Sequence, residues 1–201
     1  MITLALHLAL ATPPGLVPLA EAAPGIVQAM SYAGADNFLG RPASGYERPD
    51  CRLTARAAAA LARVQRAALV EGLSLVVHDC FRPRAASRAF VAWLGTPEDP
   101  STRARFHPTV PKNQLVRRGY IAPHSAHTAG ETVDVTLASF AAPEVPLDLG
   151  TPFDFFDPRS AHGARDVSPE AASRRATLAR LMHVAGFRAY RREWWHYTLR
   201  P

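Results

Sequence analysis

Proline is the residue type that most constrains how this chain can fold. The sequence contains 18 prolines against 12 glycines in 201 residues. Proline fixes its own φ angle and has no backbone N–H to donate, so it favours turns and rigid connections. We therefore expect the connections between elements to be frequent and stiff. Hydrophobic residues make up 48% and charged residues 20%, which are ordinary values for a globular chain long enough to form one core.

The first half of the chain predicts three regular elements. An alanine-rich run from Leu53 to Gly72 has helical periodicity, and its final glycine is placed to end a helix. The apolar segment Leu73–Asp79 predicts a short strand. Pro83 then forces a sharp exit, and a second helix is expected from about Arg84 to Leu94.

The second half predicts two strands and a third helix. Thr132–Leu137 is rich in β-branched residues and alternates polar with apolar side chains, as strands do. Ser168 followed by Pro169 supplies a capping hydroxyl and a first-turn proline, so a helix should run from there to about Val184. The closing segment 193–200 is aromatic and β-branched, which favours a strand.

The intervening residues 13–50, 95–123 and 138–167 read as loops, the first with short extended pieces. The expected fold class is α+β, with a small, mainly antiparallel sheet and about three packed helices. Residues 15–201 are expected to form a single domain. Residues 1–14 are expected to be the remnant of an export signal or a disordered start.

Charge and hydropathy exclude two classes of partner. The net charge is +6, but the basic residues are scattered arginines with a single lysine, Lys112, and no basic run interleaved with aromatics. We therefore expect no nucleic-acid partner. No segment approaches the roughly 18 to 20 apolar residues of a membrane span. The sequence carries no indication of oligomeric state.

Two cysteines, Cys51 and Cys80, form no CxxC or metal-knuckle motif. They are either two buried thiols or a disulfide, and a disulfide would require an oxidising compartment. The apolar start, Met1–Ala11, is short for a signal peptide and has no preceding basic residue, although a small-residue cleavage site follows it. A periplasmic location is slightly favoured over a cytoplasmic one. If the chain is exported, we expect a Cys51–Cys80 disulfide, because both cysteines flank one helix–strand unit.

Two short segments carry residues suited to metal chemistry. In "SAHTAGETVD", a turn at Gly130 could fold His127 back beside Asp134 at the edge of a strand. In "EWWH", Glu193 precedes His196 by three residues, and a bend between them would let both face one site. Catalytic zinc sites use three protein ligands and leave one position open. Two histidines and one aspartate fit that need, and Glu193 remains as a general base.

These segments resemble the D-alanyl-D-alanine dipeptidases, the VanX-type branch of the zinc DD-peptidases. The family patterns Ser-x-His-x-x-Gly-x-x-x-Asp and Glu-x-Trp-His are both present. Further similarity lies, in the same order as in the family, at Tyr32–Pro42, Asp79–Pro83, Gly119–His127 and Gly150–Asp157. Together these segments extend the resemblance over roughly residues 15 to 200.

The resemblance implies a zinc DD-peptidase/Hedgehog-like fold, one zinc ion and a role for each matched residue. Zinc would be held by His127, Asp134 and His196, and Glu193 would activate the water. Arg82 would stabilise the oxyanion, with a purely structural pairing to Asp79 as the alternative. The substrate would be bound by three further residues: Asp154 on its free ammonium group, with Ser125 and Tyr32 lining the same pocket.

The implied activity is hydrolysis of D-alanyl-D-alanine and related D-containing dipeptides in a bacterial cell. One alternative is a D,D-carboxypeptidase or endopeptidase acting on longer peptidoglycan stem peptides. Another is a catalytically silent zinc domain that binds cell-wall ligands, although such a domain has no need of Glu193. Antibiotic resistance, D-Ala scavenging and wall turnover all use the same chemistry.

Overall fold

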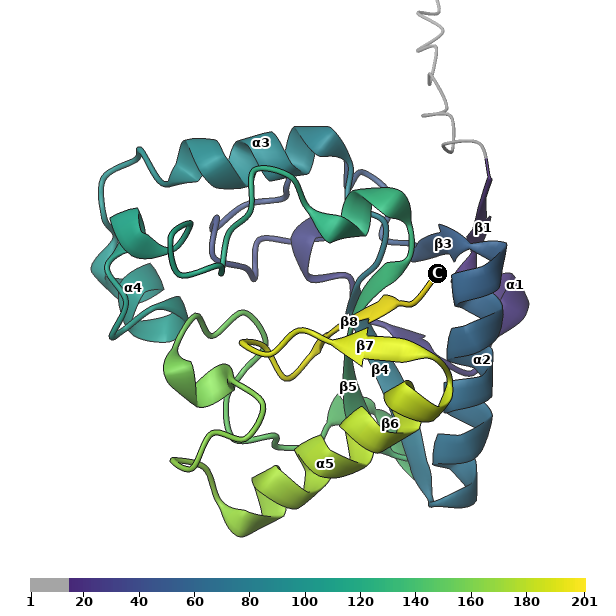
Figure 1. The fold of residues 1–201 in the computed structure, drawn as a ribbon. Coiled ribbons are helices and arrows are strands. Elements are labelled where there is room, and N and C mark those ends of the chain that lie inside the picture. The colour runs from purple at the N-terminus through teal and green to yellow at the C-terminus, as the bar shows by residue number, and fades with distance from the viewer. Residues whose placement is uncertain (1–14) are drawn as a thin grey trace, which may run out of the picture.

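The computed structural model describes residues 15–201 as an α+β fold (Figure 1). The expectation for residues 1–14 lies outside this range. A six-stranded sheet has the order β2-β4-β5-β8-β7, with β6 paired to β5, and a two-stranded sheet joins β1 to β3. Only the β2–β4 pair is parallel among the pairings of these strands, so the expected mainly antiparallel sheet is confirmed. The strands are β1 (Leu16–Pro18), β2 (Val27–Gln28), β3 (Arg52–Thr54), β4 (Leu73–Asp79), β5 (Thr132–Ser139), β6 (Ala142–Pro146), β7 (Phe187–Ala189) and β8 (His196–Leu199).

The helices of the described chain fall into two groups (Figure 1). The helices α2 and α5 pack against each other and against the sheet, whereas α3 and α4 lie on the far side among the long loops. They are α1 (Leu19–Ala22), α2 (Ala55–Val70), α3 (Arg84–Trp93), α4 (Pro100–Phe106) and α5 (Pro169–Val184), with 3-10 turns η1 (Ser31–Ala33), η2 (Lys112–Gln114), η3 (Ala126–Ala129) and η4 (Pro158–Ser160). The three longest, α2, α3 and α5, are the three helices expected from the sequence.

Local capping explains where the two longest helices begin and end. The Thr54 hydroxyl accepts a hydrogen bond from the Ala57 amide at 3.2 Å and starts α2. Ser168 does the same for α5, and Pro169 occupies its first position. Both helices end just before a glycine with positive φ, Gly72 (φ 71°) and Gly186 (φ 97°).

The structure corrects the sequence expectations at several places. The closing strand, expected over residues 193–200, is β8 and begins only at His196, and β7 was not expected. The first helix begins at Ala55 rather than Leu53, because Arg52–Thr54 pairs with β1 as β3. The segment 95–123, expected to be irregular, contains α4, whose start is capped by Asp99 accepting from the Thr102 amide at 2.7 Å. The segment 138–167, expected to be a loop, contains β6.

The strand β6 was missed because of its prolines. It runs Ala142–Pro146 and pairs antiparallel with the end of β5. Prolines lack the N–H of a ladder bond and are accepted in an edge strand, which β6 is.

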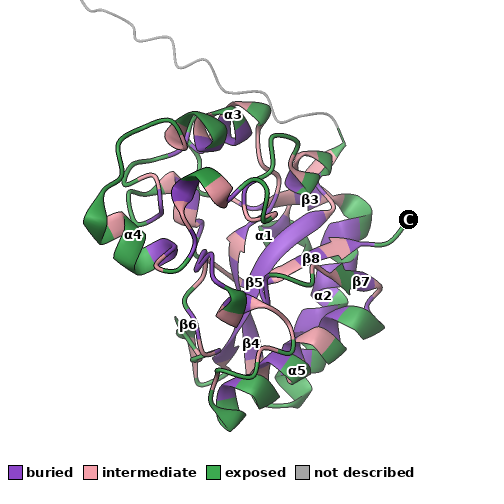
Figure 2. Ribbon diagram, turned by 60° about the vertical axis from the view of Figure 1, so that its left-hand side comes forward, coloured by how far each residue is buried: buried purple, intermediate pink, exposed green. Residues whose placement is uncertain are grey.

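The strand β5 is the centre of the molecule. All its residues except the last are buried, as Figure 2 shows by its colour. It pairs with β4 on one side and β8 on the other, so it crosses the core between two partners. A side chain on β5 is therefore held more firmly than one on any loop.

No helix among residues 15–201 has the length and apolar character needed to cross a bilayer.

Arg175 of α5 anchors a long loop to this core. Its side chain is 4% exposed and donates hydrogen bonds to the carbonyls of Leu149, Arg159 and Ala161, at 2.6 to 3.2 Å. Burial lowers the pKa of Arg175 to about 10, which still leaves it charged at neutral pH. One guanidinium thus ties both ends of the loop 149–161 to α5.

Replacing Arg175 with Met should destabilise the protein by about 3 kcal/mol, because several buried carbonyl groups lose their donor. The neighbouring Arg174 gives a matched control, since it is partly exposed and reaches only the carbonyl of Asp148. Arg174→Met should cost less than about 1 kcal/mol. Urea denaturation measures both, and equal losses for the two variants would contradict the assigned role of Arg175.

Candidate active site

Asp134 occupies the middle of a row of polar residues that runs across three strands. On β5 it pairs with Asp79 of β4 on one side and with His196 of β8 on the other. Its neighbours Val133 and Val135 point to the opposite face, as successive strand residues must. The register of the sheet therefore brings two carboxylates and an imidazole together in the interior.

His127 reaches Asp134 through a short turn. It lies in η3, where Ser125 caps the turn by accepting a hydrogen bond from the His127 amide at 3.2 Å. Gly130 ends η3 in the left-handed region (φ 72°), and a Cβ there would lie 2.5 Å from Leu16. The left-handed backbone at Gly130 favours glycine, and the chain turns there so that His127 faces β5. The expected turn at Gly130 is confirmed.

A second turn presents Glu193 and His196 to the same point. The amide of Glu193 donates to the carbonyl of Tyr190, and the amide of His196 donates to the carbonyl of Glu193. β8 begins only at His196, so the expected bend between the two residues is confirmed. As a result, Oε2 of Glu193 lies 3.7 Å from Nδ1 of His196.

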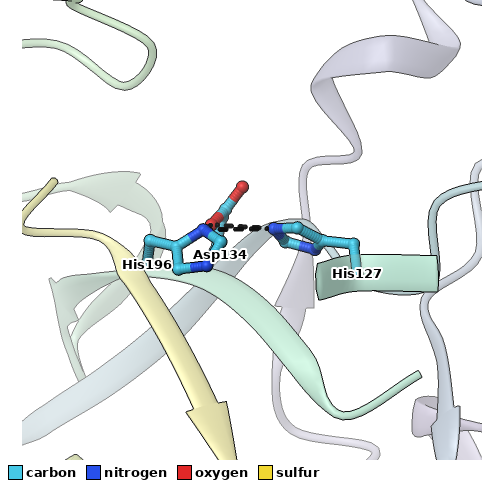
Figure 3. Close-up of side chains that lie close together, drawn as sticks. All are labelled: His127, Asp134 and His196. Carbon is cyan, nitrogen blue, oxygen red and sulfur yellow. Dashed lines mark hydrogen bonds and ion pairs between the residues drawn. The ribbon is translucent and has the colours of Figure 1, made fainter. Parts of the chain in front are cut away.

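The side chains of His127, Asp134 and His196 converge, as Figure 3 shows. The distances are 3.4 Å from His127 Nε2 to Asp134 Oδ1, 3.1 Å from His196 Nδ1 to Asp134 Oδ1, and 3.3 Å between the two nitrogens. Ligands that lie about 2.0 to 2.1 Å from a tetrahedral zinc are about 3.3 Å apart. The three donors therefore fit a small divalent cation.

Two details of the bonding strengthen this fit. Oδ1 of Asp134 is buried and has no hydrogen-bond partner, which is costly unless a cation occupies the space beside it. Nδ1 of His127 lies 2.8 Å from the carbonyl of Cys80, and a carbonyl can only accept. Nδ1 therefore carries the proton and leaves the Nε2 lone pair facing Asp134.

The charge of Asp134 is held by its surroundings. Burial by itself would raise the pKa of the Asp134 carboxyl, but the imidazoles of His127 and His196 outweigh burial and hold that pKa far below its usual value. Asp134 therefore stays ionised, as a ligating carboxylate must.

Arg82 is both paired and accessible to a ligand. Its guanidinium donates two hydrogen bonds to Oδ2 of Asp79, at 2.9 and 2.7 Å, and lies 3.8 Å from Asp134. It also stacks over the rings of Tyr32 and Phe90. Burial alone would lower the pKa of Arg82, but Asp79 and its other neighbours raise it well above normal. The expected alternative, a pairing with Asp79, is present, and Arg82 nevertheless lines the pocket.

Asp154 lies on the loop 149–161 and lines the same pocket as Arg82. It is buried, its backbone is left-handed (φ 59°), and its Oδ2 accepts a hydrogen bond from the Tyr32 hydroxyl at 2.8 Å. A non-glycine residue at positive φ is strained, and such strain concentrates at functional sites. Burial raises the pKa of Asp154 well above its usual value, and the hydrogen bond from Tyr32 offsets only part of that rise.

One pocket of about 870 Å³ unites all of these groups. Its lining includes every residue singled out from the sequence: Tyr32, Arg82, Ser125, His127, Asp134, Asp154, Glu193 and His196. Burial raises the pKa of Glu193 well above normal, the carboxylates of Asp134 and Asp154 raise it further, and Arg82 offsets only part of this. A carboxyl whose pKa is raised is a stronger base than an ordinary carboxylate, as a general base requires.

Two groups that support the site were not found from the sequence. The hydroxyl of Tyr46 donates to Oδ1 of Asp79 at 2.6 Å, and the carbonyl of Cys80 accepts from His127. Tyr46 stands in a proline-rich segment without periodicity, so nothing local marked it as buried. A backbone carbonyl has no sequence signature.

Comparison with known proteins identifies the family of this chain. Residues 13–200 match the peptidase family M15, described as D-ala-D-ala dipeptidase. A D-alanyl-D-alanine dipeptidase of Enterococcus faecalis is 37% identical over 185 residues, covering 92% of this chain and 91% of that protein. One of Enterococcus faecium is 35% identical, with 92% of each chain covered. One of Streptomyces coelicolor is 39% identical, with 90% of this chain and 89% of that one covered. The chain belongs to the M15 family of D-ala-D-ala dipeptidases.

Proposed function

We propose that this protein is a zinc-dependent dipeptidase that hydrolyses D-alanyl-D-alanine and closely related D-containing dipeptides. The observation that carries the proposal is the convergence of His127, Asp134 and His196 beside the buried carboxyl of Glu193. Its membership of the family and the names of its relatives point to the same substrate.

One zinc ion per chain would be held by Nε2 of His127, Oδ1 of Asp134 and Nδ1 of His196. These atoms all lie within 4.8 Å of one another and are largely screened from solvent. Zinc held in this way supplies an acidified water molecule and polarises the substrate carbonyl. The remaining chemistry falls to the protein's own side chains.

Glu193 carries the proton through the reaction. It takes a proton from the attacking water as the oxygen bonds to the scissile carbonyl carbon. It then gives that proton to the departing amine nitrogen as the C–N bond breaks. A pKa raised above the usual carboxyl value makes Glu193 a stronger base toward the water.

Arg82 donates hydrogen bonds to the carbonyl oxygen, which gains negative charge in the transition state. Its other contacts fix the guanidinium in position, because the Asp79 carboxylate holds one edge and the rings of Tyr32 and Phe90 hold its face. A donor that is already fixed needs no reorganisation as the charge develops.

Asp154 binds the free ammonium group of the dipeptide, with Tyr32 fixing the orientation of its carboxylate. A blocked or extended amine would leave this carboxylate buried without a counter-charge, which costs a buried charge roughly 1 to 3 kcal/mol or more. The pocket therefore favours dipeptides over longer chains. Ser125 lines the same pocket while capping η3.

The compartment is part of the proposal. Cys51 and Cys80 are joined by a disulfide, which was expected only for an exported chain. Disulfides persist in oxidising compartments. We therefore place the protein in the bacterial periplasm or outside the cell.

Removing a ligand should abolish zinc binding. We expect about one zinc per wild-type chain by atomic absorption, and less than about a tenth of that in His196→Ala, because two ligands hold the ion too weakly. His183 lies exposed at the end of α5, so His183→Ala should keep the full zinc content. Full zinc in His196→Ala would refute the ligand set.

Replacing Glu193 with Gln should lower kcat for D-Ala-D-Ala by a factor of about 10² to 10⁴ and leave the zinc content unchanged, because the amide cannot carry the proton. Release of free D-Ala measures the rate. The exposed Glu170 of α5 provides the control, and Glu170→Gln should retain wild-type kcat. A Glu193→Gln variant that keeps its kcat would exclude Glu193 as the base.

Replacing Asp154 with Asn should lower kcat/KM for free D-Ala-D-Ala by about 100-fold, because the ammonium group loses its counter-charge. Activity on N-acetyl-D-Ala-D-Ala, which has no charged amine, should change little. The exposed Asp166 serves as control through Asp166→Asn. Equal losses on both substrates would favour the alternative, an enzyme acting on longer stem peptides.

A further inference from the structure

The disulfide lies directly beside the candidate metal centre. Cys51 precedes β3 and Cys80 follows β4, and their Cα atoms are 5.3 Å apart across 29 residues of sequence. Both cysteines are completely buried. The bond therefore links the small sheet to the end of a central strand of the large sheet.

Both backbone groups of Cys80 act on residues of the site. Its carbonyl accepts the hydrogen bond from Nδ1 of His127 at 2.8 Å. Its amide donates to Oδ1 of Asp79 at 2.9 Å, the same carboxylate whose other oxygen holds Arg82. The position of this one residue thus bears on the orientation of a proposed zinc ligand and of the proposed oxyanion donor.

The pairing of β4 in the six-stranded sheet does not itself hold Cys80 in place. The pairing of β4 with β5 shifts register between Val77 and Asp79, and Asp79 is the last paired residue. Beyond that point the segment 80–82 is held by three hydrogen bonds. The amide of Phe81 donates to the carbonyl of Arg52 at 3.0 Å, and the amide of Arg82 donates to the carbonyl of His127 at 3.3 Å. The hydroxyl of Thr128 donates to the carbonyl of Arg82 at 3.2 Å. The disulfide is the covalent attachment of a segment that has left its strand.

The other half of the disulfide is well anchored. The amide of Cys51 donates to the side chain of Gln28 at 2.7 Å, and its carbonyl accepts from the amide of Leu19 at 2.9 Å. An attachment fixes a segment only when its far end is itself fixed. Because both sulfurs are buried, small thiols reach them poorly, so the bond acts as a static clamp rather than a rapid redox switch.

We propose that the Cys51–Cys80 disulfide is a positioning element of the metal centre. It holds the Cys80 carbonyl where that carbonyl sets the tautomer and ring orientation of His127, and it aligns the start of the segment that carries Arg82. This inference rests on the proposed zinc site. Groups that orient a metal ligand in this way contribute about 10- to 100-fold to metal affinity.

The test is the zinc dissociation constant of the Cys51→Ala/Cys80→Ala variant, measured by competition with a chromophoric chelator. Alanine keeps the peptide carbonyl of residue 80, so any loss reports its position and not its removal. We expect affinity at least about tenfold weaker than wild type. A histidine-selective nitrogen NMR spectrum of the metal-free protein should also show His127 as a mixture of tautomers in the variant and as one tautomer in the wild type.

A disulfide also stabilises a protein by restricting its unfolded chain, so lost stability alone would say nothing about positioning. Leu181→Ala serves as a control for stability, because Leu181 is buried in α5, on the helix that packs against β7 and α2. It should lower the melting temperature while leaving zinc affinity unchanged. If the double variant does not fold, wild-type protein reduced in denaturant and refolded without oxygen is measured in its place.

The outcomes separate the two proposals. A double variant that binds zinc within twofold of wild type, with a single His127 tautomer, overturns the positioning role and leaves the zinc site standing. Equal weakening in Leu181→Ala also overturns it, because the effect would then follow stability. A wild-type protein that binds no zinc refutes the metal site itself, and this inference with it.

Discussion

Two carboxylates, Asp79 and Asp134, lie side by side in the interior on neighbouring strands, and the site is organised around the need to compensate their charge. Buried charges are tolerated only when they are paired or bind metal. Both carboxylate oxygens of Asp79 have hydrogen-bond donors: Asp79 accepts from the hydroxyl of Tyr46, the amide of Cys80 and the guanidinium of Arg82. Asp134 keeps one oxygen without a hydrogen-bond partner and faces two imidazoles.

Because their hydrogen-bond partners differ, the two carboxylates have different roles. Asp79 serves as a structural counter-charge that fixes Arg82, and Asp134 remains available as a ligand. Sharing Arg82 between them also brings the guanidinium within 3.8 Å of Asp134, close to the centre it is proposed to assist. One buried pair of acids can thus place both the metal and the oxyanion donor.

The rest of the pocket also contains buried carboxyl groups that lack a full counter-charge. Asp154 and Glu193 are buried, burial raises the pKa of each, and the carboxylate of Asp134 raises both pKa values further. A cation at the His127–Asp134–His196 site and an ammonium group at Asp154 would relieve this repulsion. The pocket without ligands therefore carries electrostatic stress of the kind that binding of a metal and a dipeptide removes.

Much of this could be predicted from the sequence, because it depends on local order. Strand Leu73–Asp79 has the expected bounds, and the capping residues Ser168 and Pro169 start α5 where they should. The turn at Gly130 and the bend after Glu193 follow from residue type and spacing. These two local features of the candidate metal site could therefore be predicted from the sequence. The helix α4 and the strand β6 were missed because proline-rich composition outweighed a single capping aspartate and an edge pairing.

The sequence by itself determined which residues are candidates for the chemistry, since ligand types, their spacing and the family motifs are all local properties. Only the tertiary structure decided which of them meet. The sheet register sets Asp79, Asp134 and His196 in one row, and these three residues meet only when strands distant in the sequence pair in the folded chain. The tautomer of His127 depends on a backbone carbonyl 47 residues away, and every residue has a carbonyl, so only folding selects the one at Cys80.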